Sequence, residues 1–153
     1  MDVFVSLTLS VEAILLAKEA SASSVPSFMY ISAAAGAPVL PQRYITTKRA
    51  AESTIASEFP SLRSIFFRPG MLYDSSRSIT MALAGATFAG AMANSLVGGR
   101  LTPLMGAGGT KPLKADLVGE AVVEALADDG TKGIVEVPGI EELANRHWRR
   151  GML

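Results

Sequence analysis

The sequence has no cysteine and a single histidine, His147, among its 153 residues. Without cysteine the chain forms no disulfide, no thiolate metal site and no cysteine nucleophile, and this absence fits a reducing compartment. One histidine rules out a histidine-based metal cluster, so we expect no metal site. The charge is balanced, with 14 Lys and Arg against 14 Asp and Glu. Because positive charge is not in excess, we expect no nucleic-acid partner.

The amino-terminal residues lack the pattern of a targeting signal. Asp2 stands where a secretory signal has basic residues, and Glu12 and Lys18 interrupt the apolar part. The stretch also lacks the arginine enrichment of a mitochondrial presequence. We therefore expect these residues to form a helix that leads into the first strand.

Residues 79–98 are uncharged and long enough to cross a bilayer. Ala82, Ala86 and Gly90 recur every four positions, as in closely packed helices. Polar residues dilute the stretch, however, and alanine and glycine contribute little transfer free energy. We therefore predict a helix that is buried or faces a partner, rather than one that spans a membrane.

The order of hydrophobic patterns predicts one domain of the α/β class with a parallel sheet. Its 49% hydrophobic residues are enough for a core. Strands are expected at 27–34, 64–73 and 133–139, the second one broken by Pro69 and Gly70. Helices are expected at about 9–20, 42–59, 79–97, 116–128 and 142–150, with Asp116 as an N-cap and residues 105–112 as a glycine-rich loop.

A serine, a tyrosine and a lysine form the candidate catalytic group. Tyr44 and Lys48 lie one turn apart on a predicted helix, and Ser32 lies at the carboxyl end of a predicted strand, where open α/β sheets bind ligands. A phenol has a pKa of about 10, and a fixed ammonium beside it favours the phenolate. Tyr-x-x-x-Lys is common by chance, however, and in the structural alternative Tyr44 covers the start of the helix and Lys48 pairs with Glu52.

The order of these motifs resembles the extended and atypical branches of the short-chain dehydrogenase/reductase family. The resemblance covers about residues 6 to 142 and is strongest to a mitochondrial atypical subfamily associated with ubiquinone biosynthesis, which is related to the nucleotide-binding accessory subunit of respiratory complex I. It is carried by MYISAAAG, PQRYITTKRAAE, FFRPGMLYD, KPLKADLVGEAVVEAL and GIVEVPGIEEL.

The resemblance implies a Rossmann-like doubly wound sheet and a site for NAD or NADP. It makes Ser32, Tyr44 and Lys48 catalytic, assigns Lys48 to the cofactor ribose, and places Arg68, Pro69 and Gly70 beside the nicotinamide. The substrate would be a small molecule that the resemblance does not identify.

Two departures from the family pattern change these expectations. Family members have a glycine-rich turn between the first strand and helix, where backbone N–H groups receive the pyrophosphate. Here no glycine precedes Gly36. Many relatives also have an asparagine that relays protons in the helix before the serine strand, whereas the first asparagine here is Asn94. We therefore expect residues 1–153 to form an incomplete domain that lacks the glycine-rich βαβ unit and binds NAD(P) weakly.

Two functions follow as hypotheses. The first is an NAD(P)-dependent oxidoreductase-like protein, located in mitochondria by resemblance. The second is a non-catalytic accessory or assembly protein that uses the fold as a binding platform, associated with a protein complex or peripherally with a membrane. An incomplete sheet with an unpaired edge would also make the isolated chain prone to association.

Overall fold

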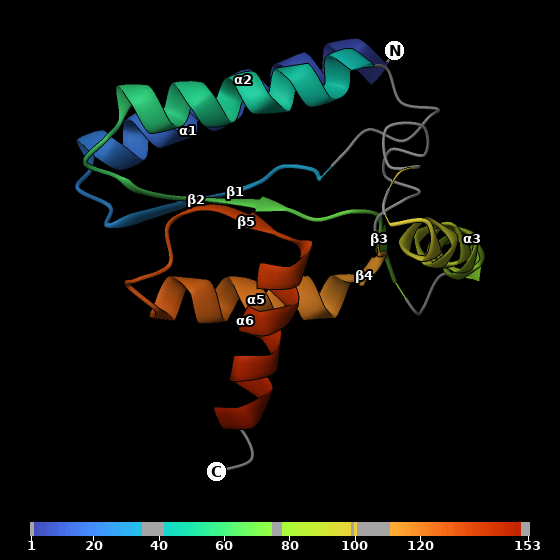
Figure 1. Cartoon of the computed structure of the whole chain (residues 1–153). Coiled ribbons are helices and arrows are strands. Elements are labelled where there is room, and N and C mark those ends of the chain that lie inside the picture. The colour runs from blue at the N-terminus through green and yellow to red at the C-terminus, as the bar shows by residue number, and fades with distance from the viewer. Residues whose placement is uncertain (1, 35–41, 75–77, 99, 101–110, 151–153) are drawn as a thin grey trace.

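A three-stranded parallel sheet forms the centre of the molecule (Figure 1). The computed structural model describes residues 2–34, 42–74, 78–98, 100 and 111–150. The sheet has the order β1–β2–β5, and Tyr30 pairs with Phe66 across the first pair of strands. Its strands are β1 (Ser27–Ile31), β2 (Arg63–Arg68) and β5 (Gly133–Glu136).

Helices cover both faces of this sheet (Figure 1). On one face α1 (Asp2–Ala22) and α2 (Gln42–Glu58) lie side by side, and on the other lie α5 (Ala115–Ala127) and α6 (Val137–Arg150). The predicted α/β class and parallel sheet are therefore confirmed. The more specific Rossmann-like architecture stays a prediction.

The alternation of side chains along β2 divides the core into two clusters. Phe67 is fully buried on the side of α5 and α6, and Phe66 is buried on the side of α1 and α2. The first cluster contains Ile65, Phe67, Leu113, Val118, Ala121, Ala125, Val135, Ile140, Leu143 and Ala144. The second contains Ala13, Ala17, Ile55, Leu62 and Phe66. Each helical layer thus has its own apolar contact with the central strand.

The segment after β2 differs from the prediction. The sequence suggested one interrupted strand at 64–73, but β2 ends at Arg68 and Leu72–Tyr73 forms a separate strand, β3. β3 pairs in parallel with β4 (Leu113–Lys114), which the sequence did not predict. Pro69 has no N–H to continue the β2 ladder, which accounts for the end of that strand.

Two predicted boundaries near the carboxyl end are also wrong. The last strand was expected at 133–139, but it ends at Glu136, and α6 begins at Val137 with Pro138 in its first turn. Asp116 is not an N-cap, because α5 begins at Ala115 after Lys114. The Asp116 carboxylate instead forms a 2.6 Å ion pair with the Lys114 ammonium.

Helix α3 (Ser78–Leu96) lies at the end of the molecule beside β3 and β4 (Figure 1). From Gly85 onward most of its side chains are exposed, so this part is not buried within the chain, and the alternative that it faces a partner stays a prediction. Among the described residues, no helix is both long and apolar enough to cross a membrane. The predicted glycine-rich loop lies outside the described residues, except for Lys111 and Pro112.

Candidate functional site

The predicted serine, tyrosine and lysine lie near the carboxyl end of β1. Ser32 follows the last residue of β1, and its amide donates a 2.7 Å hydrogen bond to the Phe67 carbonyl, which extends the pairing with β2. Tyr44 and Lys48 lie one turn apart in α2. The register of the sheet and the packing of α2 together bring these residues to one edge.

The ammonium of Lys48 lies between two tyrosine rings. Its Nζ is 4.9 Å from the ring centroid of Tyr30 and 5.5 Å from that of Tyr44, both within the range of a cation–π contact. It also donates a 3.1 Å hydrogen bond to the Ile31 carbonyl and lies 3.5 Å from the Tyr30 hydroxyl. The tyrosine and lysine of the predicted triad are therefore neighbours, at the position that the sequence suggested.

Ser32 is held by a different set of partners. Its side chain is buried, with 5% of the residue exposed, and its Oγ accepts a 3.1 Å hydrogen bond from Arg49 Nη1. The same guanidinium donates to the carbonyls of Ala33 and Ala34 through Nη2, at 2.6 and 3.0 Å. Among the described residues, no hydrogen bond joins Ser32 to Tyr44. Arg49 thus holds the chain after β1 in place through two carbonyls, and it also donates a hydrogen bond to the Ser32 hydroxyl.

Four charged residues, Arg49, Glu52, Arg68 and Glu136, form what we call the carboxyl-edge cluster. Glu52 is its centre: Oε1 lies 2.6 Å from Arg49 Nη1, and Oε2 lies 2.5 Å from Arg68 Nη2. Arg68 also pairs with Glu136 at 2.9 Å. The cluster therefore connects α2 to the carboxyl ends of β2 and β5, while Arg49 adds the end of β1.

Glu52 remains a carboxylate although it is 4% exposed. Burial raises its pKa, but hydrogen bonds from Arg68 and Ser32 and the charges of Arg49 and Arg68 lower it, and the net pKa lies below the ordinary value. The hydrogen bond from Arg68 to Glu52 likewise raises the pKa of the guanidinium, with a further contribution from Glu136. Both charges are thus stabilised by each other.

The three residues assigned to the nicotinamide follow one another at the end of β2. Arg68 directs its guanidinium to Glu52 and Glu136, and Pro69 is buried with its carbonyl accepting a 2.8 Å hydrogen bond from the Ala34 amide. Gly70 is partly exposed beside them. They lie at the carboxyl edge of the sheet, where Arg68 makes structural contacts, and a cofactor beside them stays a prediction.

The alternative in which Lys48 pairs with Glu52 is wrong, because Glu52 pairs with Arg49 and Arg68. Tyr30, Arg49 and Glu136 also belong to this edge and were not predicted from the sequence. Arg49 and Glu52 are three residues apart on a helix, a spacing that brings side chains together and that supplied a usable signal. Tyr30 carried no such signal, since an aromatic residue in a strand is ordinary.

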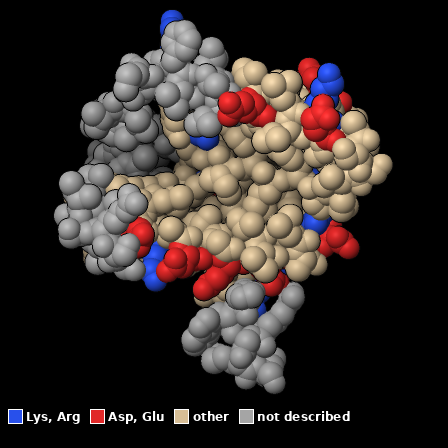
Figure 2. Space-filling view, turned by 180° about the vertical axis from the view of Figure 1, so that it is seen from behind, with Lys and Arg blue, Asp and Glu red and all other residues tan. Residues whose placement is uncertain are grey.

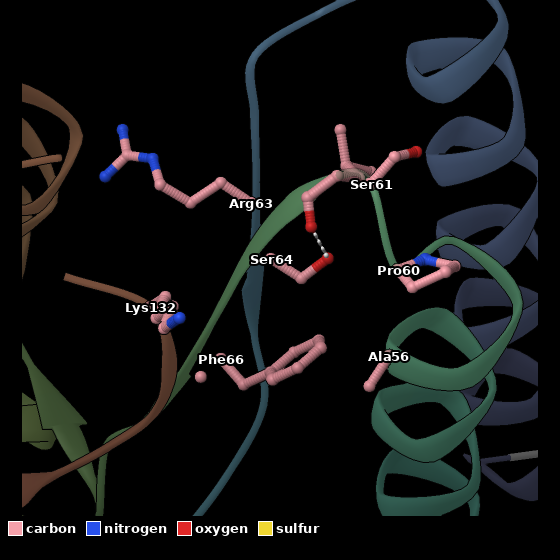
Figure 3. Close-up of a pocket in the computed structure, with 9 residues that line it drawn as sticks. Ala56, Pro60, Ser61, Arg63, Ser64, Phe66 and Lys132 are labelled. Atoms are coloured by element: carbon pink, nitrogen blue, oxygen red, sulfur yellow. Dashed lines mark hydrogen bonds between the residues drawn. The ribbon is translucent and has the colours of Figure 1, made fainter. Parts of the chain in front are cut away.

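A cavity of about 600 Å³ lies at the opposite edge, near the amino ends of β2 and β5 (Figure 3). Ala56, Pro60, Phe66 and Lys132 are among its lining residues, and the Ser64 hydroxyl donates to the Leu62 carbonyl. Arg63 also borders the cavity, but its side chain points away from Phe66 (Figure 3). The cavity is thus separate from the edge that carries Lys48 and Tyr44.

The Arg63 side chain binds backbone carbonyls at the carboxyl end of helix α5 and in the loop after it. Its guanidinium donates to the carbonyls of Ala125, Leu126, Asp128 and Thr131, and its Nε donates to the Ser27 hydroxyl. A cation at a helix carboxyl terminus satisfies carbonyls that have no partner within the helix. Among the described residues, no group of three histidine, aspartate or glutamate side chains is arranged to hold a metal ion.

Comparison with known proteins gives one partial similarity to report. MIOREX complex component 2 from Saccharomyces cerevisiae is 39% identical over 61 residues, which are 40% of this chain and 22% of that protein. The matched stretch thus spans about a fifth of the relative's length. No family model matches the sequence. No solved structure matches it either.

Proposed function

We propose that the protein is an NAD(P)-dependent oxidoreductase-like protein of the atypical short-chain type. The observation that carries the proposal is the pair of Tyr44 and Lys48 at the carboxyl edge of a parallel sheet, with the ammonium 5.5 Å from the ring centroid. This is the edge at which open α/β sheets bind ligands. The parallel order β1–β2–β5 with helices on both faces supports the same proposal.

In this proposal each residue has a defined task. Tyr44 exchanges a proton with the substrate oxygen, and Lys48 places a positive charge beside the phenol and donates to hydroxyls of the cofactor ribose. Ser32 acts indirectly, because Arg49 and Glu52 bind its hydroxyl and thereby shape the chain after β1. NAD or NADP, when bound, supplies or accepts the hydride.

Ligand-observed NMR of the chain with NADPH tests the cofactor part of the proposal. We expect saturation transfer to the ribose protons with a dissociation constant of about 1 mM or weaker, near −4 kcal/mol. The weak binding follows from the lack of any glycine before Gly36. Lys48→Met should abolish the transfer. Lys132→Met is the matched control, because Lys132 is exposed at the opposite edge of the sheet.

Equal transfer in both lysine variants would contradict a ribose site at Lys48. Micromolar affinity, measured by calorimetry, would contradict the view that the pyrophosphate site is missing. The chemical step is tested in any longer natural form of the protein with a panel of carbonyl and quinone acceptors. There Tyr44→Phe should lower turnover about 10²- to 10⁴-fold, the usual contribution of a positioned acid or base.

The second candidate function is that of an accessory or assembly protein. Two observations favour it: the partial relative is named as a component of a complex, and α3 presents an exposed apolar stripe. The stripe consists of Phe88, Met92 and Leu96, which are 50%, 59% and 82% exposed and four residues apart on the helix. Seen from behind, most charged side chains also lie around the margin of the described surface (Figure 2).

Two measurements separate these candidates. Replacing Phe88, Met92 and Leu96 with glutamine should reduce self-association or complex formation in size-exclusion chromatography, because exposed apolar patches promote association. The matched control replaces Val11, Leu15 and Leu16 of α1, which are also exposed. Binding of NADPH without turnover, unchanged by Tyr44→Phe, would favour the accessory function over the oxidoreductase.

The proposal places the protein in mitochondria, within or beside a protein complex. It rests on the resemblance to a mitochondrial subfamily associated with ubiquinone biosynthesis, and the relative's name is consistent with complex association. Fractionation of native cells tests the location directly. Recovery of the protein outside the mitochondrial fraction would contradict it.

A further inference from the structure

A second tyrosine, Tyr30, lies beside the candidate catalytic lysine. Its ring centroid is 4.9 Å from Lys48 Nζ, closer than the 5.5 Å to Tyr44, and its hydroxyl is 3.5 Å from the same nitrogen. The hydroxyl contact is long for a hydrogen bond, and the two distances together place the ammonium at the hydroxyl end of the Tyr30 ring, so that hydroxyl and ring both contribute to the contact.

The ring of Tyr30 is itself fixed in place. It is half-buried and packs against the apolar cluster between the sheet, α1 and α2, on the same side of β1 as Phe28. The backbone of β1 pairs with β2 at Tyr30 and Phe66. Tyr30 is therefore a rigid surface for the ammonium, while the four-carbon stem of a lysine has many conformations to lose.

We propose that Tyr30 is a positioning residue of the candidate site, which holds the Lys48 ammonium against the carboxyl end of β1 and next to Tyr44. The inference rests on the proposed function for its significance, but its geometry is independent of any cofactor. Three neighbouring groups define the position: the Tyr30 ring, the Ile31 carbonyl at 3.1 Å and the Tyr44 ring. Ser32 cannot replace Tyr30 in this task, because Arg49 and Glu52 hold its hydroxyl.

The test is the proton chemical shift of the Lys48 Cε methylene group, recorded in ¹H–¹³C spectra of the chain. Ring currents displace the signals of protons held next to an aromatic ring, so the Lys48 signal should be displaced from that of the exposed Lys132. Lys48→Arg assigns the signal. In Tyr30→Leu most of this displacement should be lost, whereas Tyr30→Phe, which keeps the ring, should retain it.

Tyr73→Leu serves as the control, because Tyr73 lies in β3 and pairs with Lys114 instead. It should leave the Lys48 signal unchanged. Overlap of the Lys48 and Lys132 signals in the unaltered chain would overturn the proposal, even if Tyr30→Leu failed to fold. Retention of the shift in a folded Tyr30→Leu variant would also overturn it.

The outcome is distinguishable from failure of the proposed function. In a longer natural form that turns over NADPH, Tyr30→Leu should lower turnover and Tyr30→Phe should restore most of it. A shifted Lys48 signal in a protein that binds no NADPH would support the position of the lysine and contradict the oxidoreductase. Full turnover in Tyr30→Leu would contradict the positioning role alone.

Discussion

The two ends of strand β2 carry the same residue type in opposite environments. Arg63 begins the strand and donates to four backbone carbonyls and one serine hydroxyl. Arg68 ends it and pairs with two carboxylates, Glu52 and Glu136. Both side chains are 16% exposed. The two arginine side chains are therefore equally buried, and they differ in the groups that they contact.

The close partners of Arg63 are neutral, and its one ion pair is a 3.8 Å contact with the exposed carboxylate of Asp129. These partners suit an arginine that binds a helix end. Carbonyls at the end of α5 do not change their charge with pH. The charged partners at Arg68 create an interdependent set instead, in which the loss of one member leaves another charge buried without compensation. Substitution of a charged residue should therefore lower the stability of the fold more at the carboxyl edge of the sheet than at the Arg63 end. The carboxyl edge is also the end that carries Lys48 and Tyr44.

Glu52→Gln should have the largest effect on stability. It removes the central charge of the carboxyl-edge cluster and leaves Arg49 and Arg68 without their shared carboxylate. Breaking one side of a buried pair costs roughly 3–5 kcal/mol. Urea unfolding followed by circular dichroism measures this loss. Glu58→Gln, at an exposed position of the same helix, is the control and should change stability by less than about 0.5 kcal/mol.

Arg63→Met should have a smaller effect, about 2 kcal/mol, because the carbonyls it leaves are near the surface and water can partly replace the guanidinium. The same urea experiment measures the difference. Arg43→Met is the matched control, since Arg43 is exposed in α2. A larger loss for Arg63→Met than for Glu52→Gln would mean that the Arg63 end, and not the carboxyl-edge cluster, contributes more to holding β2 in the fold.

Much of this fold was readable from the sequence. The spacing of apolar residues located the three central strands and the helices on either side, because period and length distinguish buried strands from amphipathic helices. The spacing of Tyr44 and Lys48 also placed them on one side of a helix, next to the strand that ends before Ser32. These features depend on local sequence alone.

The remaining features depend on contacts between distant segments. Glu52 and Arg68 are 16 residues apart, and helical spacing alone gave Lys48 as the partner of Glu52. β3 and β4 contain two residues each, too few to show any periodicity. The exposure of α3 contradicts its apolar composition, because burial depends on the neighbours that cover a helix as well as on hydropathy.

The smallest effect we predict is a change in acid stability that separates the two ends of β2. The folded pKa of Glu52 lies below its ordinary value, despite burial, because of Arg68, Ser32 and Arg49. Its contribution to stability is therefore fully present above the unfolded pKa of about 4.3 and is lost as the pH falls through the folded pKa.

The measurement is the free energy of unfolding at several pH values between about 7 and 3, in the parent and in Glu52→Gln. Each pKa unit corresponds to about 1.4 kcal/mol. The parent should lose more stability on acidification than the variant, because glutamine does not titrate. Asp128, near Arg63, also has a lowered pKa, since Thr131 and the Gly130 amide donate to it. Asp128→Asn controls for this group and should reduce the acid dependence less than Glu52→Gln, because Asp128 lies nearer the solvent. The same acid dependence in the parent and in Glu52→Gln would show that the carboxyl-edge cluster does not set the pH response of the fold.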